Sequence, residues 1–104
     1  MNGLTGKIIH AKFGSAGQHN EFAYVVKETP QTLQVLVLER ERVSGDSQIG
    51  SERPIIPSAL ALANAKKNAI RVNKKPDNDG GIMLWGHDLL WIEWDGEPKS
   101  YFID

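Results

Sequence analysis

The chain contains no cysteine, which excludes disulfide bonds and thiolate chemistry. A small domain without disulfides depends on its hydrophobic core, and this suits a reducing compartment. The chain also has no apolar run long enough to span a bilayer. Residues 1–7 lack the basic stretch followed by an apolar run that marks a signal peptide. These absences predict a cytoplasmic protein that does not enter a membrane.

A strong excess of charge of either sign is missing as well. The formal net charge is −1, so no overall field draws the protein onto nucleic acid or an anionic membrane. The 104 residues are 40% hydrophobic and 24% charged, which is typical of a folded protein rather than a disordered one. A chain of this length does not readily build two separate cores. We therefore expect a single domain over residues 1–104.

Motifs for metals, nucleotides and catalysis are not found either. The three histidines (His10, His19 and His87) fit no short metal-ligand spacing. No glycine-rich phosphate-binding or dinucleotide-binding motif occurs. The sequence thus predicts no metal, no cofactor and no assigned catalytic residue, and it favours a binding function over an enzymatic one.

What the sequence does contain is a series of alternating strands. Residues 7–13, 21–27 and 32–41 alternate in the way that predicts β-structure. The third segment is apolar on both faces, so we expect it in the centre of a sheet or in a barrel wall that also packs against a partner. With their tight turns, these opening strands resemble SH3-like small barrels. The resemblance implies a fold and no functional residues.

The middle of the chain predicts a loop and then a helix. Residues 42–53 are rich in serine and glycine, and we expect an irregular and flexible loop there. Residues 58–69 contain five alanines after Ser58, a suitable N-cap, and predict a short helix. A strand is the alternative, because Leu60 and Leu62 lie two residues apart. Further strands are predicted at 69–75 and 82–85, joined by a turn.

The C-terminal residues predict a hairpin of 89–94 with 99–103. A two-residue loop would place Pro98 in a paired strand, whereas a four-residue loop at 95–98 keeps it in the turn. The second register gathers one set of side chains on a buried face: Leu90, Ile92, Trp94, Tyr101 and Ile103. The whole chain is then mainly β (α+β), a small antiparallel barrel or strongly bent sheet of six to seven strands with one short helix.

Charge is segregated along the second half of the sequence. Residues 64–76 carry no acid but five basic side chains: Lys66, Lys67, Arg71, Lys74 and Lys75. Residues 77–104 carry seven acids and a single basic residue, Lys99. The favoured interpretation is that the basic strand pairs with the acidic C-terminal region, within one chain or across a dimer. The alternative is a stripe that binds the phosphates of nucleic acid.

Aromatic side chains gather in the last twenty residues and predict an interaction surface. Trp85, Trp91 and Phe102 fall on the second face of the expected hairpin and need a cover. The leading hypothesis is a binding module that forms a homo-oligomer. The alternatives are a protein partner and a small-molecule or weakly catalytic pocket around the break in the strand. That candidate pocket consists of Trp85, His87, Asp88, Trp91 and Glu93.

Overall fold

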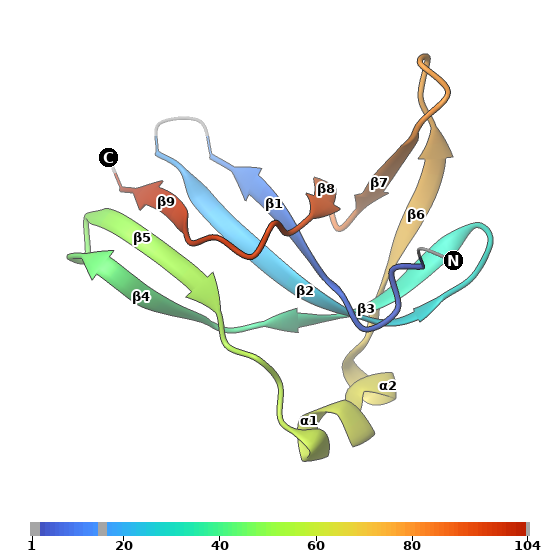
Figure 1. Ribbon diagram of the computed structural model, residues 1–104, viewed down its shortest axis with the longest axis horizontal. Helices are drawn as coiled ribbons and strands as arrows, with labels where there is room; N and C mark the ends of the chain where they lie inside the picture. The colour runs from blue at the N-terminus through green and yellow to red at the C-terminus, as the bar shows by residue number, and fades with distance from the viewer. Residues whose placement is uncertain (1–2, 15–16, 104) are drawn as a thin grey trace.

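A computed structural model of the protein, covering residues 3–14 and 17–103, is built mostly from β-strands (Figure 1). Six strands close into an antiparallel barrel, in the order β1-β2-β3-β6-β7-β8, and a second sheet has the order β4-β5-β9. The barrel strands are β1 (Ile8–Phe13), β2 (His19–Glu28), β3 (Thr32–Leu38), β6 (Ile70–Pro76), β7 (Ile82–Gly86) and β8 (Leu89–Glu93). The second sheet consists of β4 (Arg40–Gly45), β5 (Ile49–Pro54) and β9 (Lys99–Phe102). The predicted fold class, a mainly β chain with a small antiparallel barrel, is confirmed.

The core of the protein is the interior of the barrel. Because successive residues of a strand point to opposite faces, each barrel strand sends every second side chain inward. The inward side chains form one apolar cluster, and Leu84 pairs directly with Trp91 across β7 and β8. The large side chains of this cluster that are fully or almost fully buried are Ile9, Val25, Leu33, Val35, Val72 and Trp91. Burial of each large apolar side chain contributes about 1.5–3 kcal/mol, so the interior is the main source of stability.

The prediction of an irregular loop at 42–53 was wrong. These residues form most of a hairpin in which β4 pairs with β5, and they raise the number of strands in the described residues to nine. Two of the serines that indicated a loop, Ser44 and Ser51, face each other across the paired strands with 2.7 Å between their hydroxyl oxygens, and the turn is held by its neighbouring residues. The Asp46 carboxylate accepts hydrogen bonds from the Gln48 and Ile49 N–H groups at 2.8 and 3.0 Å, and Gly45 has a φ of +89°.

The predicted C-terminal hairpin was also wrong, although both of its strands exist. β8 pairs with β7 and closes the barrel on β1, so neither of its edges is left for β9, which pairs with β5. The connection 94–98 carries the chain from the barrel to the second sheet (Figure 1). The expected faces of β8 are therefore exchanged. Trp91 is buried, whereas Leu90 and Ile92 are 48% and 60% exposed.

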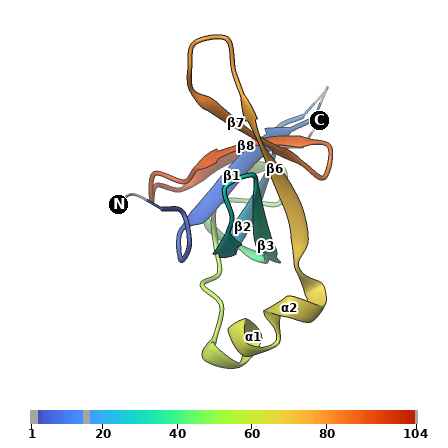
Figure 2. The ribbon, with the colours of Figure 1, turned by 90° about the vertical axis from the view of Figure 1, so that its right-hand side faces the viewer.

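The predicted helix at 58–69 is confirmed and lies outside the barrel. It consists of α1 (Ala59–Ala63) and α2 (Ala65–Asn68), and the Ser58 hydroxyl caps α1 by accepting from the Ala61 N–H at 3.1 Å. Figure 2 places both helices at the end of the molecule opposite the tip of the β6–β7 hairpin. The segment that leads into α1 covers the outer side of β3, where Leu36 and Ile55 line one hollow.

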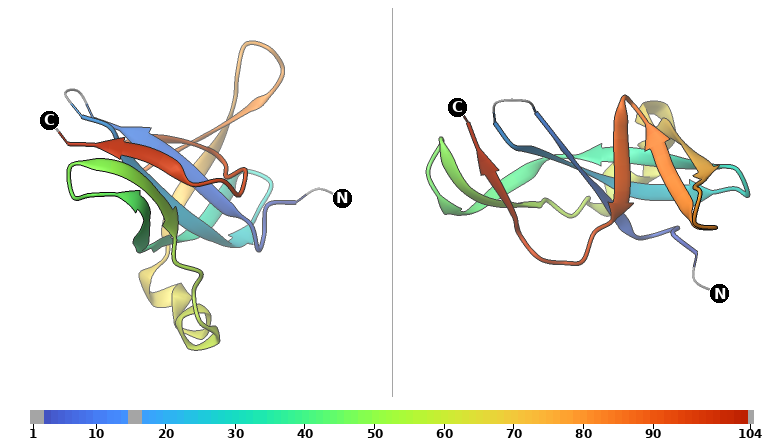
Figure 3. Two further views of the ribbon diagram at one scale, coloured as in Figure 1. Left: turned by 60° about the vertical axis from the view of Figure 1, so that its left-hand side comes forward. Right: turned by 90° about the horizontal axis from the view of Figure 1, so that it is seen from above.

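The outer surface of the barrel is divided into a covered and an uncovered part. The second sheet lies beside β1 and β2, and β6 and β7 are on the other side of the molecule (Figure 3). On the covered part, His10, Asn20 and Phe22 point out of the barrel and are nevertheless almost fully buried. On the uncovered part, Trp85 is 43% exposed. The uncovered surface of β6 and β7 and the junction of the two sheets are therefore the candidate functional surfaces.

Candidate functional site

The predicted small-molecule pocket is not assembled as one site. Trp85 pairs with Leu90 on the outside of the barrel wall, whereas Trp91 pairs with Leu84 on the inside. The Trp91 indole N–H donates to the Gly86 carbonyl at 3.0 Å, which satisfies its only polar group. Glu93 lies at the rim of the barrel, where its carboxylate is 3.4 Å from the Lys7 ammonium. Trp85 and Trp91 therefore cannot line the same pocket.

His87 and Asp88 form the turn between β7 and β8. Their φ angles are +56° and +60°, and they lie between the paired residues Gly86 and Leu89. A two-residue hairpin loop with positive φ at both positions is a type I′ turn, whose twist matches that of the flanking strands. Both side chains are exposed. The two residues thus have a conformational role that accounts for their position at the break in the strand.

The basic side chains of the predicted segment 64–76 do not form one surface, because alternate residues of β6 point to opposite sides of the barrel wall. Lys74 points to the end of the barrel and forms an ion pair with Glu28, which also accepts a hydrogen bond from the Leu4 N–H at 2.7 Å. Arg71 and Lys75 point outward and are exposed. Lys67 is exposed on α2, and the side chain of Lys66 lies outside what the structure describes.

The expected ion pairing of the basic strand with the acidic C-terminal region is not made within the described part of the chain, and pairing across a dimer stays a prediction. β6 lies between β3 and β7, and its ion pair is made with β2 rather than with the acids of 77–104. Within residues 3–14 and 17–103, Arg71 and Lys75 make no ion pair. The nearest of these acids, Asp77 and Asp79, lie in the turn that follows β6, and in the described residues neither forms an ion pair with Arg71 or Lys75. The charge of Arg71 and Lys75 is therefore left on the surface.

The outward residues of β6 belong to a surface that we call the basic face. Register places Lys27, Gln34 and Arg71 in one row across β2, β3 and β6. A second row, across β3, β6, β7 and β8, consists of Thr32, Asn73, Trp85 and Leu90. A third row pairs Lys75 with Met83. In the basic face, Arg71 and Lys75 therefore flank the strand position opposite exposed Trp85, and Lys27 lies two strands further along the barrel wall from Arg71. None of the residues in these rows is acidic. The cationic, amide and indole side chains of this face are those of Lys27, Arg71, Asn73, Lys75 and Trp85.

Lys27 was missed by the sequence reasoning because of a β-bulge. Simple alternation puts Lys27 on the same face of β2 as Ala23 and Val25, which point into the barrel. The register shifts between Val25 and Lys27, so that one extra residue lies in β2 and the following side chains exchange faces. Lys27 is turned outward by this shift. A lysine within a run of apolar residues indicates a side chain that points outward. Only the pairing of β2 with β3 shows that this one does.

A groove runs beside the basic face. It has a volume of about 700 Å³ and lies between the turn that joins β2 to β3 and the outward side chains of β6. Pro30 and Gln31 form one wall, and Arg71, Asn73 and Lys75 form the other. A groove with basic side chains along one wall can hold an extended anionic chain.

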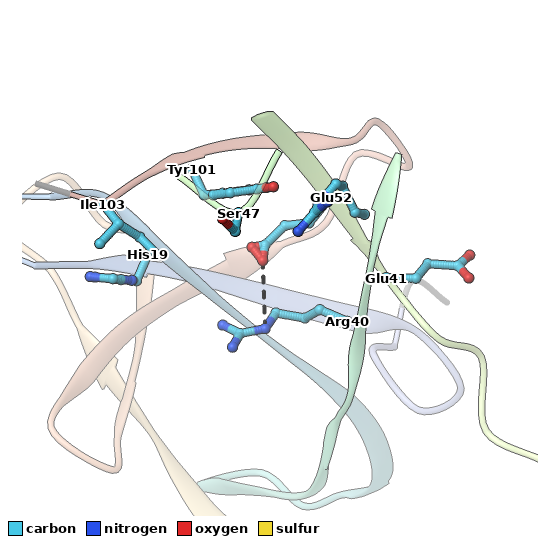
Figure 4. Close-up of a pocket in the computed structure, with 8 residues that line it drawn as sticks. His19, Arg40, Glu41, Ser47, Glu52, Tyr101 and Ile103 are labelled. Carbon is cyan, nitrogen blue, oxygen red and sulfur yellow. Dashed lines mark ion pairs between the residues drawn. The ribbon is translucent and has the colours of Figure 1, made fainter. Parts of the chain in front are cut away.

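A second candidate lies where the second sheet meets the barrel, and we call it the polar hollow (Figure 4). Its volume is about 290 Å³. In Figure 4 the Arg40 and Glu52 side chains face each other, with 3.6 Å between Arg40 Nε and Glu52 Oε1, and Glu41 points away. The residues that line the polar hollow are His19, Arg40, Glu41, Arg42, Ser47, Glu52, Tyr101 and Ile103.

A buried chain of hydrogen bonds extends from the polar hollow into the covered face of the barrel. The Asn20 amide donates to Glu52 at 3.4 Å and to the Ser100 carbonyl at 2.9 Å, and its oxygen lies 2.8 Å from His10 Nε2. Arg40 donates to the Asn20 carbonyl. Burial lowers the pKa of His10, so the neutral imidazole is the form that fits this network. These contacts join the second sheet to the barrel through polar groups.

Of the three aromatic residues predicted to need a cover in a homo-oligomer, Trp85 and Phe102 are exposed, whereas Trp91 is not. Trp91 is 2% exposed inside the barrel and cannot meet a second copy without unfolding. Pairing through the exposed edge of β4 is also disfavoured. Two copies related by a two-fold axis would pair residues on the same face of the sheet, which brings Arg40 against Arg42 or Glu39 against Glu41. Like charges of this kind protect strand edges.

Comparisons with protein-family models, curated protein sequences and solved structures found no match for this chain. In the part of the chain that the structure describes, no helix is long and apolar enough to cross a membrane. The same residues contain no group of three histidine or acidic side chains placed to hold a metal ion. The basic face and the polar hollow are therefore the two candidate functional surfaces.

Proposed function

We propose that this protein binds single-stranded nucleic acid through the basic face. The observation that carries the proposal is the register of β6 with its neighbours, which brings exposed Trp85 beside Asn73 and between the cations Arg71 and Lys75. Two residue sets that the sequence suggested separately, an aromatic one and a basic one, thereby become one surface.

The cations supply contacts for phosphate groups. Arg71 and Lys75 are four residues apart on one face of β6, or about 13 Å at the usual rise of a strand. They line the same groove, together with Gln31 and Thr32. An extended polynucleotide lying in this groove would place phosphates beside Arg71 and Lys75, and a strand that continues across β3 would reach Lys27 on β2.

Trp85 supplies the contact for a base. Its indole is 43% exposed, and in the described residues it has no aromatic partner. Base stacking on an exposed aromatic contributes about 1–3 kcal/mol per base and tolerates any sequence. Asn73, its direct neighbour across the strands, has an amide that can donate to and accept from a base edge. A stacked base must be unpaired, so the surface favours a single strand.

The net charge of −1 does not oppose this function. At physiological salt the Debye length is about 8 Å, so exposed charges on distant parts of the molecule are largely screened. The three rows of the basic face carry Lys27, Arg71 and Lys75 without an acid. Local charge at the groove, rather than the total, decides whether phosphate is attracted.

The test is a fluorescence-anisotropy titration of a short labelled oligothymidine at several salt concentrations. With about 0.7 counterions released per phosphate contact, three cations give a slope of log K against log salt near about −2. Trp85→Ala should weaken binding by about 1–3 kcal/mol at every salt concentration. Arg71→Gln should also reduce the slope by about 0.7. Lys12→Gln, an exposed lysine on β1 outside the basic face, is the matched control and should change neither quantity.

Two results would overturn the proposal. One is binding that does not weaken as salt is added. The other is an affinity that Trp85→Ala and Arg71→Gln leave at the value of the unchanged protein. Equal affinity for duplex and single-stranded oligonucleotides would contradict the stacking role of Trp85 and leave only a phosphate-binding surface.

A further inference from the structure

The polar hollow contains hydrogen-bond donors that the fold itself does not use. In residues 3–14 and 17–103, the side chains of His19, Arg42 and Ser47 make no hydrogen bond or ion pair within the protein, although all three line the hollow. Arg42 is a guanidinium with five donors, and serine and histidine each offer one. The unused capacity of the hollow is therefore mainly that of a donor.

The acidic groups around the hollow are, in contrast, already occupied. Glu52 is held by Arg40 and by the Asn20 amide. Glu41 accepts from Arg53 Nε at 2.6 Å on the outer side of β4. The pKa of Asp46 in the adjacent turn is lowered by the N–H groups of Gln48 and Ile49, with a smaller contribution from Arg42. On the side that faces the hollow, Arg40 and Arg42 thus oppose the single carboxylate of Glu52.

The walls of the hollow are set by backbone geometry. Tyr101 lies directly opposite Gly50 in the β5–β9 ladder, and its hydroxyl donates to the Asp46 carbonyl. A Cβ atom on Gly50 would come within 2.9 Å of the Tyr101 hydroxyl and within 2.1 Å of the Ser44 carbonyl. The absence of a side chain at position 50 therefore lets the phenol lie across the top of the hollow, as Figure 4 shows.

We infer that the polar hollow binds a small molecule carrying a carboxylate or phosphate group. Arg42 from β4 and His19 from β2 would contact the anion, and Ser47 would donate a further hydrogen bond. The apolar side chain of Ile103 gives the rest of the molecule a surface to pack against. The volume of about 290 Å³ is at the small end of the range of ligand sites. This inference concerns a different surface from the basic face and does not depend on it.

The experiment is an NMR titration of the ¹⁵N-labelled chain with inorganic phosphate and, separately, with acetate. Sodium chloride keeps the ionic strength constant, so that general screening does not change. We expect saturable shifts of the amide signals of Ser47, Glu52 and Tyr101. Tighter binding of phosphate or of acetate identifies the anionic group. Arg42→Gln should weaken binding about tenfold or more, because it removes a charge-assisted donor from an exposed side chain without touching the Arg40–Glu52 pair.

The matched control is Arg53→Gln, which removes the same charge from the outer side of the β4–β5 hairpin. Its affinity should stay within about twofold of the unchanged protein. Shifts that rise linearly without saturation would show that no site exists. Equal weakening by Arg42→Gln and Arg53→Gln would show general attraction to the hairpin, and it too would overturn the inference. The dispersion of the amide spectrum confirms in each case that the variant is folded.

Discussion

The two outer faces of the barrel carry similar side chains in opposite surroundings. On the covered face, formed by β1 and β2, an asparagine, an aromatic ring and a histidine are all buried beneath the second sheet: Asn20, Phe22 and His10. On the basic face, an asparagine and an aromatic ring, Asn73 and Trp85, are paired with each other and open to solvent. The same wall thus provides a structural junction on one side and a free surface on the other.

The comparison shows that cover, rather than residue type, decides what these side chains do. A buried amide must have its hydrogen bonds made inside the protein, and Asn20 makes them with His10, Glu52 and the Ser100 carbonyl. Asn73 makes no side-chain hydrogen bond in the described residues. Water can bond to its amide, so the fold does not have to supply a partner. The side chains of the covered face therefore stabilise the fold, whereas those of the basic face are available to a ligand.

The largest contrast is expected between the two aromatic side chains. Phe22 is fully buried, stacks on His10 with ring centroids 4.8 Å apart and meets Trp94 edge-on at 5.8 Å. Phe22→Ala should therefore lower the free energy of unfolding by about 3–5 kcal/mol. Trp85→Ala, on the basic face, should change it by less than about 1 kcal/mol. Urea denaturation of both variants measures the difference, and similar losses would show that the basic face is also packed.

A smaller contrast is expected between the two asparagines. Asn20→Ala removes three hydrogen bonds and leaves the buried His10 imidazole without its partner, which should cost about 1–3 kcal/mol, although the Ser100 carbonyl still accepts from the Gln18 amide. Asn73→Ala removes no bond of the described fold and should cost less than about 0.5 kcal/mol. Hydrogen exchange should also show that Asn20→Ala exposes amides of β5 and β9 before those of the barrel. A uniform increase over both sheets would mean that the network does not join them.

The barrel could be predicted from sequence because its signals are local. Alternation in β1, β2 and β3 and the proline- and glycine-rich turn before β7 are visible in single segments. The errors came from long-range pairing. Nothing local says that β8 uses both of its edges inside the barrel, so β9 was assigned to the wrong partner and Trp91 to the wrong face. A change of partner of this kind inverts every side chain in the strand.

The candidate sites were less predictable than the fold, for the same reason. The basic residues Arg71 and Lys75 and the aromatic Trp85 were each singled out by composition, but their adjacency depends on the register of β6 with β7. Lys27 needed the bulge in β2. The polar hollow joins β2, β4, β5 and β9, which are separated by tens of residues, and it includes a segment predicted to be a loop. No pattern within one segment could have indicated it.

The smallest of the expected effects is a dependence of stability on pH that comes from the covered face and not from the basic face. The pKa of His10 is lowered, first by burial and then by the nearby charges of Lys99 and Lys12, while the hydrogen bond with Asn20 opposes this shift. As the pH falls below about 6.5, the unfolded chain gains a proton at this histidine and the folded protein does not. The contribution of His10 to the free energy of unfolding should therefore be fully present above that pH and decline as the pH falls through the lowered pKa.

Urea denaturation between pH 7.5 and 5 measures this effect before most carboxylates titrate. His10→Gln keeps a hydrogen-bonding amide beside Asn20 but cannot take up a proton, so the dependence on pH should become flatter. The matched variant is His87→Asn, whose side chain is exposed in the type I′ turn and whose positive φ asparagine tolerates. It should keep the slope of the unchanged protein. If His10→Gln keeps the full slope as well, another group carries the acid sensitivity. The junction would then not be the part of the protein that responds to pH.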